Sequence, residues 1–333
     1  MPPLLDQRDP LPGKVLKRTF VVGARIGSGA VYDVYESRQL SVENRKVAVK
    51  VVKKALCRDS DTDAQVHLQH HAFERRVLGA LRSTCFAVLL DAGSVLDGEV
   101  ERPYLVTEYL PGRQLSEVLS VSGSLGSDQA LMLFLVLAEG LDELHSSHVA
   151  YRDLSPSNVI LQYGSSGQVV PRLFDFSHVS AFSGALPRDQ RNKTWILAGT
   201  PPFAAPELTS GQGDARSDVF SLASLLYTSL CGVPPVTGPA GTWREYVAAL
   251  RANPTLPHRS LASQGVAAGS VLDPVLSVAL RFQPRERYVS INDFVLALSQ
   301  AVAGNLDHMK VGPDRSGLFA RLLRGMKGSA PPL

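Results

Sequence analysis

Tyr151-Arg152-Asp153-Leu154-Ser155-Pro156-Ser157-Asn158 is the stretch of the sequence that says most about fold and function. Asp153 and Asn158 lie five positions apart in what we expect to be a loop. A carboxylate in such a loop can orient a hydroxyl group, and an amide oxygen can bind a divalent metal ion. The stretch therefore predicts a catalytic loop, although Asp153 would also suit an ordinary turn.

A second acidic group follows in Leu173-Phe174-Asp175-Phe176, where Asp175 lies seventeen residues after Asn158 and directly after an expected short strand. Magnesium bound to ATP needs about two oxygens from the protein, because phosphates and water complete its octahedron. Asn158 and Asp175 meet that demand. The alternative is that Asp175 only caps the end of a strand.

Two shorter patterns lie upstream of this loop. Gly27 and Gly29 stand at an expected strand–turn–strand corner, where backbone amides can approach a phosphate chain closely. Paired glycines also suit a plain turn. Val47-Ala48-Val49-Lys50 ends an apolar strand with a lysine, whose ammonium group can neutralise phosphate oxygens or simply extend into solvent. Glu74, on an expected helix, can pair with Lys50 or lie on a solvated helix face.

Hydrophobic periodicity predicts an α+β fold in two lobes. Strands are expected at residues 20–26, 31–35, 46–52, 86–90 and 104–109, and helices at residues 63–82, 128–146, 217–231 and 291–302. Ser127 or Asp128 is the expected cap of the second helix. The first lobe would hold five strands and one helix, the second would be mainly helical, and a cleft would separate them.

The order of these motifs resembles the eukaryotic-type (Hanks-type) protein kinase family, and within it the bacterial Ser/Thr branch. The resemblance covers roughly residues 18–303 and implies a bilobal protein-kinase-like fold. Its motifs are residues 27–34, Lys50, Glu74, Tyr151-Arg152-Asp153, Asp175-Phe176-Ser177, Ala205-Pro206-Glu207, Asp218-Val219-Phe220-Ser221-Leu222 and Pro284-Arg285-Glu286-Arg287-Tyr288. It implies that Asp218 holds the backbone of the catalytic loop and that Arg287 pairs with Glu207.

The resemblance also implies the roles of the site residues, with ATP and Mg²⁺ as cofactors. The expected catalytic residues are Asp153, Lys50, Glu74, Asn158 and Asp175, of which Asn158 and Asp175 would bind the metal. The expected nucleotide-binding residues are Ile26, Gly27, Gly29, Val34, Ala48, Lys50, Glu108, Leu110 and Ile160. Lys50 would hold the phosphates and Asp153 would accept the proton of the substrate hydroxyl.

The implied function is an ATP- and magnesium-dependent kinase that phosphorylates Ser or Thr residues of proteins and its own activation segment. Thr200, in Gly199-Thr200-Pro201, would dock protein substrates, which argues against a kinase of small molecules. Arg152 would pair with a phosphorylated loop residue, for which Thr194 is the candidate. The alternative function is a pseudokinase that acts as a nucleotide-binding or scaffold module.

Four positions depart from the family pattern. Tyr32 replaces the third glycine and is expected to cover the phosphates; Tyr151 replaces a histidine and is expected to keep its packing on Phe176; Ser177 replaces a glycine. Ser155 replaces the lysine that neutralises the γ-phosphate, a change expected to cost about 2–4 kcal/mol of transition-state stabilisation unless another cation compensates.

Composition sets the remaining expectations. Hydrophobic residues make up 44%, charged residues 20%, and the formal net charge is +3, which gives no reason to expect nucleic-acid binding. Three scattered cysteines and the lack of a signal-peptide core predict a cytoplasmic protein. The predicted organisation is a flexible leader at 1–17, a kinase domain at 18–304 (N-lobe 18–107, hinge 108–112, C-lobe 113–304) and a basic amphipathic tail at 305–333. The tail would contact an acidic partner or a membrane surface, or pack on its own lobe.

Overall fold

The computed structural model describes residues 9–58, 62–164, 168–182, 199–211, 213–236, 243–252 and 259–304. The chain divides into two compact units, one formed by Met1–Arg82 and Ala87–Pro111 and the other by Ser83–Phe86 and Gly112–Leu333. The last boundary between the units, between Pro111 and Gly112, falls inside the segment predicted as a hinge, residues 108–112. The predicted tail, 305–333, lies outside the described residues.

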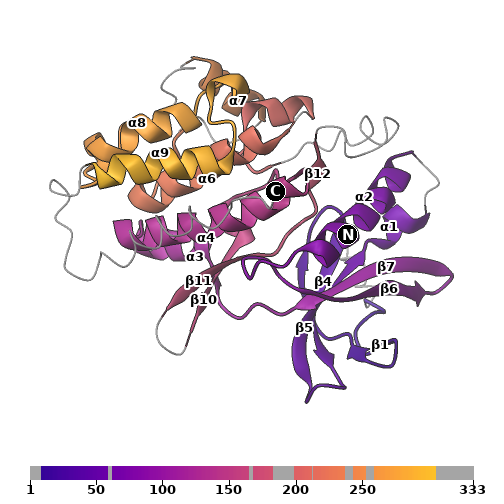
Figure 1. Ribbon diagram of the computed structural model, residues 1–333. Coiled ribbons are helices and arrows are strands. Elements are labelled where there is room, and N and C mark those ends of the chain that lie inside the picture. Colours follow the sequence, from indigo (N-terminus) through magenta and orange to yellow (C-terminus); the bar gives the residue numbers. More distant parts are fainter. Residues whose placement is uncertain are drawn as a thin grey trace, which may run out of the picture. The chain divides into compact units, whose positions relative to one another are not determined.

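The first unit is built on an antiparallel sheet (Figure 1). Its strands are β1 (Val15–Leu16), β2 (Phe20–Val21), β3 (Arg25–Ser28), β4 (Tyr32–Gln39), β5 (Arg45–Val52), β6 (Leu89–Asp97) and β7 (Val100–Glu108). They run in the order β1-β2-β4-β5-β7-β6, with β3 paired to β4. Two helices, α1 (Lys54–Arg58) and α2 (Thr62–Ala80), follow β5, and α2 contacts β6.

The register of the central strands places several predicted site residues on one face of this sheet. Lys50 lies opposite Val34 on β4 and opposite Leu105 on β7. Because side chains alternate along a strand, Ala48 shares the face of Lys50, and Tyr32 shares the face of Val34. Alternation therefore brings Tyr32, Val34, Ala48 and Lys50 to the same side of the sheet.

The structure corrects the predicted first lobe at its start. The flexible leader at 1–17 is wrong for residues 9–17, because Leu11 and Leu16 belong to the buried core of the sheet and β1 is one of its strands. The strand expected at 86–90 starts only at Leu89, and Phe86 instead makes a single bridge to Leu173. The described part of this unit thus has seven strands and two helices in place of five and one.

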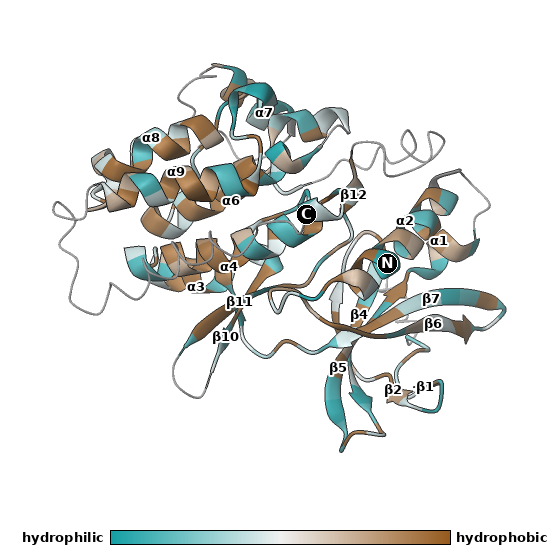
Figure 2. Cartoon of the chain, in the orientation of Figure 1, coloured by the Kyte–Doolittle hydropathy of each residue, from teal (hydrophilic) through white to brown (hydrophobic). Residues whose placement is uncertain are grey.

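The second unit is mainly helical, as predicted. Its helices are α3 (Leu115–Ser122), α4 (Ser127–Ser146), α6 (Ala215–Cys231), α7 (Trp243–Ala252), α8 (Gly269–Ala279) and α9 (Ile291–Ala303). Short strands accompany them: β8 (Arg113–Gln114), β9 (Val149–Ala150), β10 (Val159–Tyr163), β11 (Val169–Leu173) and β12 (Ser180–Ala181). Hydrophobic residues occupy much of α6, α8 and α9 (Figure 2), and α4 contacts both α6 and α9. Phe134 and Phe294 meet edge to face, with 5.1 Å between ring centres.

Polar side chains fix the first residues of two of these helices. Asp214 and Ser217 form a reciprocal capping box at the start of α6, and Ser290 and Asp293 form another at the start of α9. The predicted cap of α4 is wrong: Gly126 occupies the cap position without a side-chain bond, and Ser127 and Asp128 already belong to the helix. Within the described residues, no helix combines the length and apolarity needed to span a membrane.

Candidate active site

The first unit contains a buried ion pair between strand and helix. Lys50 Nζ on β5 lies 2.8 Å from Glu74 Oε1 on α2, and the Glu74 side chain is fully buried. A buried carboxylate is costly unless it is paired and hydrogen-bonded, so this pair fixes both side chains. The structure therefore forms the Lys50–Glu74 pair that the sequence suggested.

Tyr32 completes this cluster. Its phenol donates a hydrogen bond of 2.6 Å to Glu74 Oε2 and lies 3.1 Å from His71 Nδ1. Lys50 Nζ lies 4.6 Å from the centre of the Tyr32 ring, at cation–π distance. Tyr32 was expected to cover the phosphates, but only 4% of its surface is exposed. It points inward and binds the carboxylate instead.

His71 is neutral in this cluster. Burial lowers its pKa to about 4, and the nearby charge of Glu74 only partly opposes that effect. A phenol has one hydrogen, which Tyr32 gives to Glu74, so its oxygen accepts from His71. We therefore assign the proton of the neutral imidazole to Nδ1.

The glycine-rich hairpin has room beside its backbone. A side chain added at Gly27 or Gly29 would meet no atom of the chain closer than 3.9 Å, and neither glycine has a positive φ. The fold itself does not require glycine at these positions. Their lack of side chains fits the close approach of a phosphate chain.

The predicted adenine-binding residues are found in both units. In the first, Val34 and Ala48 are half-buried and Leu110 is buried, whereas Ile26 is 53% exposed. The backbone N–H of Glu108 donates to the carbonyl of Val88 at 3.0 Å, so Glu108 can offer adenine only its carbonyl oxygen. In the second unit, the half-buried Ile160 lies on β10 opposite Gln114 and Arg172.

A buried aspartate of the second unit holds the loop that was predicted to be catalytic. Asp218 on α6 accepts the backbone N–H groups of Tyr151 and Arg152 at 2.7 and 2.8 Å. The same side chain lies 2.8 Å from His145 Nε2. The role expected for Asp218 is confirmed.

Asp153 is surrounded by hydrogen-bonding groups. Thr200 Oγ1 donates to its Oδ1 at 2.8 Å, and Asn158 Nδ2 donates to its Oδ2 at 2.8 Å. His178 Nδ1 also lies 3.3 Å from Oδ2. The structure thus brings together Asp153, Asn158 and Thr200, which were predicted as catalytic, metal-binding and docking residues. It adds His178, which the sequence analysis did not single out.

Two hydrogen bonds orient the amide of Asn158. Its nitrogen donates both to the side chain and to the backbone carbonyl of Asp153, each at 2.8 Å. Two acceptors on one side identify the nitrogen, and the amide oxygen remains as the atom for the predicted metal. Asp175 Oδ1 accepts the N–H of Ser177 at 3.1 Å. An amide oxygen and a carboxylate are ligands that Mg²⁺ takes together with phosphate oxygens, so the donor chemistry of Asn158 and Asp175 fits the predicted metal. Among the described residues, no group of three or more His, Cys, Asp or Glu suits a metal.

Aromatic packing supports this loop. Tyr151 meets Phe176 edge to face at 5.5 Å, and Phe86 meets Phe176 at 5.4 Å. Complete burial raises the pKa of Tyr151 well above its ordinary value, so the phenol stays neutral. The structure confirms that Tyr151 keeps the packing on Phe176.

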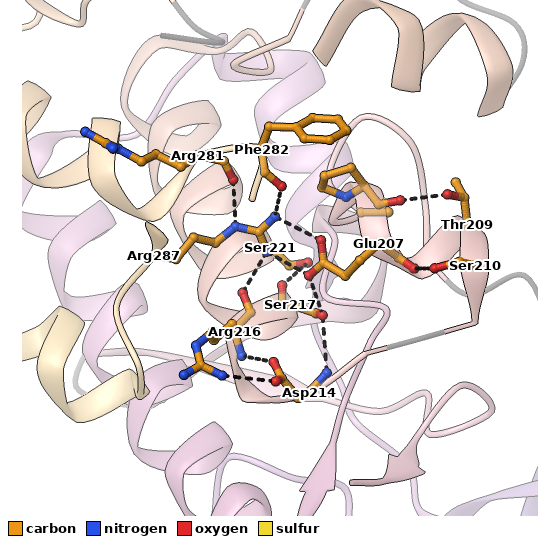
Figure 3. A network of polar contacts seen from close by, with 12 residues as sticks. Glu207, Thr209, Ser210, Asp214, Arg216, Ser217, Ser221, Arg281, Phe282 and Arg287 are labelled. Carbon is orange, nitrogen blue, oxygen red and sulfur yellow. Dashed lines mark hydrogen bonds and ion pairs between the residues drawn. The ribbon is translucent and has the colours of Figure 1, made fainter. Parts of the chain in front are cut away.

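A second polar network anchors the Ala205-Pro206-Glu207 motif (Figure 3). The Arg287 guanidinium binds both carboxylate oxygens of Glu207, at 2.7 and 2.9 Å. Its remaining N–H groups donate to the backbone carbonyls of Arg281, Arg216 and Phe282. All five donors of the side chain are therefore used, and the pairing expected between Arg287 and Glu207 is confirmed.

Of the two predicted regulatory residues, the structure describes Arg152 and not Thr194. Thr194 lies outside the described residues, so the structure does not test its pairing with Arg152. Arg152 itself is 2% exposed, and its burial lowers the guanidinium pKa against the opposing charge of Asp218.

The chain is similar to known proteins along most of its length. The family model described as "Protein kinase domain" matches residues 20–287. A probable serine/threonine-protein kinase of Corynebacterium efficiens is 26% identical over 277 residues, which are 82% of this chain and 40% of that protein. Serine/threonine-protein kinase PknB of Mycobacterium tuberculosis is 29% identical over 82% of this chain and 41% of its own. Serine/threonine-protein kinase PknL of the same species is 28% identical over 84% of this chain and 65% of its own. The chain thus spans well under half the length of the first two relatives.

Proposed function

The chain belongs to the protein kinase domain family, and on that premise we propose that it transfers the γ-phosphoryl group of ATP to Ser or Thr hydroxyls of proteins in a magnesium-dependent reaction. The arrangement of Asp153 carries this proposal. Its carboxylate is held by Asn158 on one oxygen and by Thr200 on the other, which suits a group that must orient a hydroxyl. The names of the bacterial relatives support Ser/Thr specificity.

The residues of the chain divide the work as follows. Lys50, fixed by Glu74, binds phosphate oxygens of ATP. Asp153 orients the substrate hydroxyl and accepts its proton as the new oxygen–phosphorus bond forms and the bond from the γ-phosphorus to the bridging oxygen breaks. Asn158 and Asp175 would hold Mg²⁺, which neutralises phosphate charge when bound. Such a reaction depends on positioning and charge more than on covalent catalysis.

The competing proposal is a pseudokinase that binds nucleotide without transferring phosphate. Ser155 in place of a lysine motivates it, because one positive charge is missing beside Asp153. The paired Lys50 and Glu74 and the complete Asp153–Asn158 arrangement favour the enzyme.

Phosphoryl transfer from radiolabelled ATP to the chain itself and to a generic protein substrate tests the choice. The wild-type chain should incorporate label, and both Lys50→Met and Asp153→Asn should lower incorporation at least 100-fold while circular dichroism shows that each variant is folded. Lys50→Met should melt at a lower temperature than the wild type, because it leaves the buried Glu74 carboxylate without its cation. Asp153→Asn with near wild-type turnover would contradict the mechanism. Wild-type protein that binds ATP without transferring label would favour the pseudokinase.

We further propose that the chain phosphorylates its own activation segment at Thr194 and that the phosphate pairs with Arg152. A phosphate adds about −1.5 to −2 charge at neutral pH, enough to order a loop through an arginine. Mass spectrometry of active protein tests this proposal, and an unmodified Thr194 in a fully active preparation would contradict it.

A further inference from the structure

The catalytic loop lacks a cation at the position two residues after Asp153. Ser155 occupies this position, is 0% exposed, and its hydroxyl has no hydrogen-bond partner within the part of the chain that the structure describes. A short buried side chain cannot reach a transferring phosphoryl group. The charge that a lysine would supply beside Asp153 must come from elsewhere or be absent.

His178 is in direct contact with Asp153. Its Nδ1 lies 3.3 Å from Asp153 Oδ2 and also 3.3 Å from the hydroxyl of Ser177. The imidazole side chain is 28% exposed, so the ring reaches the surface of the second unit. No described residue bonds its other nitrogen, Nε2. One edge of the ring therefore rests on the catalytic carboxylate, and the opposite nitrogen is available to a ligand.

The charges around His178 favour the imidazolium form. Burial on its own would lower its pKa, but the hydrogen bond and charge of Asp153, joined by the charge of Asp175, outweigh burial and the opposing charge of Arg152. The net effect raises the pKa of His178 above its ordinary value. An imidazolium donates from both ring nitrogens, whereas neutral imidazole donates from one.

We propose that His178, as an imidazolium, supplies the positive charge that Ser155 cannot, donating from Nδ1 to Asp153 and from Nε2 to the oxygens of the γ-phosphoryl group during transfer. This inference rests on the proposed kinase activity. His178 keeps its protons throughout: the hydroxyl proton goes to Asp153, and the γ-phosphorus passes from the bridging oxygen to the hydroxyl oxygen. The histidine transfers no proton and acts as a charged hydrogen-bond donor, placed where negative charge is redistributed.

Steady-state kinetics of the full chain with ATP and a peptide substrate test this role. His178→Gln keeps a donor near the Nε2 position but loses the charge. We expect kcat to fall about 100-fold, the order of magnitude that one preorganised electrostatic contact contributes, while KM for ATP changes less than about 3-fold. His178→Lys should retain most of the activity. His67→Gln, a histidine of α2 outside the site, is the matched control and should be unchanged.

Restoring the family lysine provides the decisive comparison. Ser155→Lys should rescue His178→Gln to within about 10-fold of the wild type, because one cation replaces the other. Wild-type kcat should decline as pH rises through the pKa of His178, and the Ser155→Lys/His178→Gln double variant should not show this decline. Melting temperatures establish that each variant is folded, which matters most for the buried position 155.

A measurement independent of turnover completes the test. Titration of the His178 imidazole by NMR should give a higher pKa in the wild-type chain than in Asp153→Asn, because the carboxylate charge stabilises the imidazolium. A folded His178→Gln variant with wild-type kcat would overturn the role of His178 and leave the kinase activity standing. Equal pKa values for His178 in the wild-type chain and in Asp153→Asn would do the same. A wild-type chain with no more transfer than Asp153→Asn would overturn the kinase activity, and this role with it.

Discussion

The phenol of Tyr32 is bonded to Glu74 Oε2 at 2.6 Å, while Lys50 contacts the other oxygen of the same carboxylate at 2.8 Å. A glycine at position 32 would offer neither the hydrogen bond nor the ring that faces Lys50. Tyr32 begins β4 at the turn of the glycine-rich hairpin, and Glu74 lies in the middle of α2. The contact therefore ties that hairpin to the helix within the first unit.

Tyr32→Phe should weaken this tie. The variant keeps the ring but loses the hydroxyl, so we expect the free energy of unfolding of the first unit to fall by about 1.5–3 kcal/mol, the usual contribution of a hydrogen bond to a charged group. KM for ATP should rise as Lys50 becomes less well positioned. Tyr163→Phe, at an exposed tyrosine, is the control and should change neither denaturation nor kinetics. Equal behaviour of Tyr32→Phe and the wild type would show that the hydroxyl is dispensable.

Arg287→Met should be among the most destabilising single substitutions in the second unit. It leaves the Glu207 carboxylate without the cation that binds both of its oxygens, and breaking a buried pair in this way costs about 3–5 kcal/mol. Arg285→Met, at an exposed neighbour, should cost under about 0.5 kcal/mol. Urea denaturation followed by circular dichroism measures both. A Glu207→Met/Arg287→Met double variant more stable than Arg287→Met alone would show that the unpaired charge causes the loss.

His71 should make stability depend on pH below neutrality. Its pKa is lowered to about 4 in the folded chain, against about 6.5 in the unfolded chain. Between these values the unfolded chain binds the proton first, so stability falls as pH drops from about 6.5 to about 4, by about 3 kcal/mol in total. His71→Gln should remove this part of the pH dependence. Parallel stability–pH curves for the variant and the wild type would contradict the assignment.

Thermal-shift measurements should separate the contributions of ATP and Mg²⁺ to the melting temperature. ATP alone should raise the melting temperature of the wild-type chain, and ATP with Mg²⁺ should raise it further, because each bound ligand stabilises the folded form. Asp175→Asn should lose the increment due to Mg²⁺, and Lys50→Met should mainly lose the shift due to ATP alone. The same Mg²⁺ increment in Asp175→Asn and the wild type would remove Asp175 from the predicted metal site.

Candidate site residues that lie in short motifs could be predicted from the sequence. Residues whose side chains connect one motif to another could not. Lys50, Asp153 and Asp175 each lie in a local pattern whose chemistry is evident from neighbouring letters. Tyr32 reaches a partner 42 positions away, and its inward direction follows from strand register, which no local pattern specifies. His178 was missed because its contact with Asp153 depends on the path of the loop between β11 and β12.

The predicted bounds of helices and strands were wrong where several residues gave competing sequence signals. Ser127 and Asp128 are both common cap residues, yet the chain extends the helix over them and leaves Gly126 at the cap position. At the start of the chain, Leu11 and Leu16 stand among prolines and charged residues without a hydrophobic periodicity, so the sequence pattern did not predict that they belong to the core. They are buried by strands of the sheet that come later in the sequence.

The burial of the N-terminal segment has a practical consequence for recombinant work. A domain cut to begin at residue 18, near the start of the family match at residue 20, would remove Leu11 and Leu16 from the core and Asp9 from its hydrogen bond with the Tyr35 phenol. The exposed apolar surface left on the sheet would favour self-association and poor yield. Expression boundaries for this protein are therefore better set before Asp9 than at the edge of the recognised family.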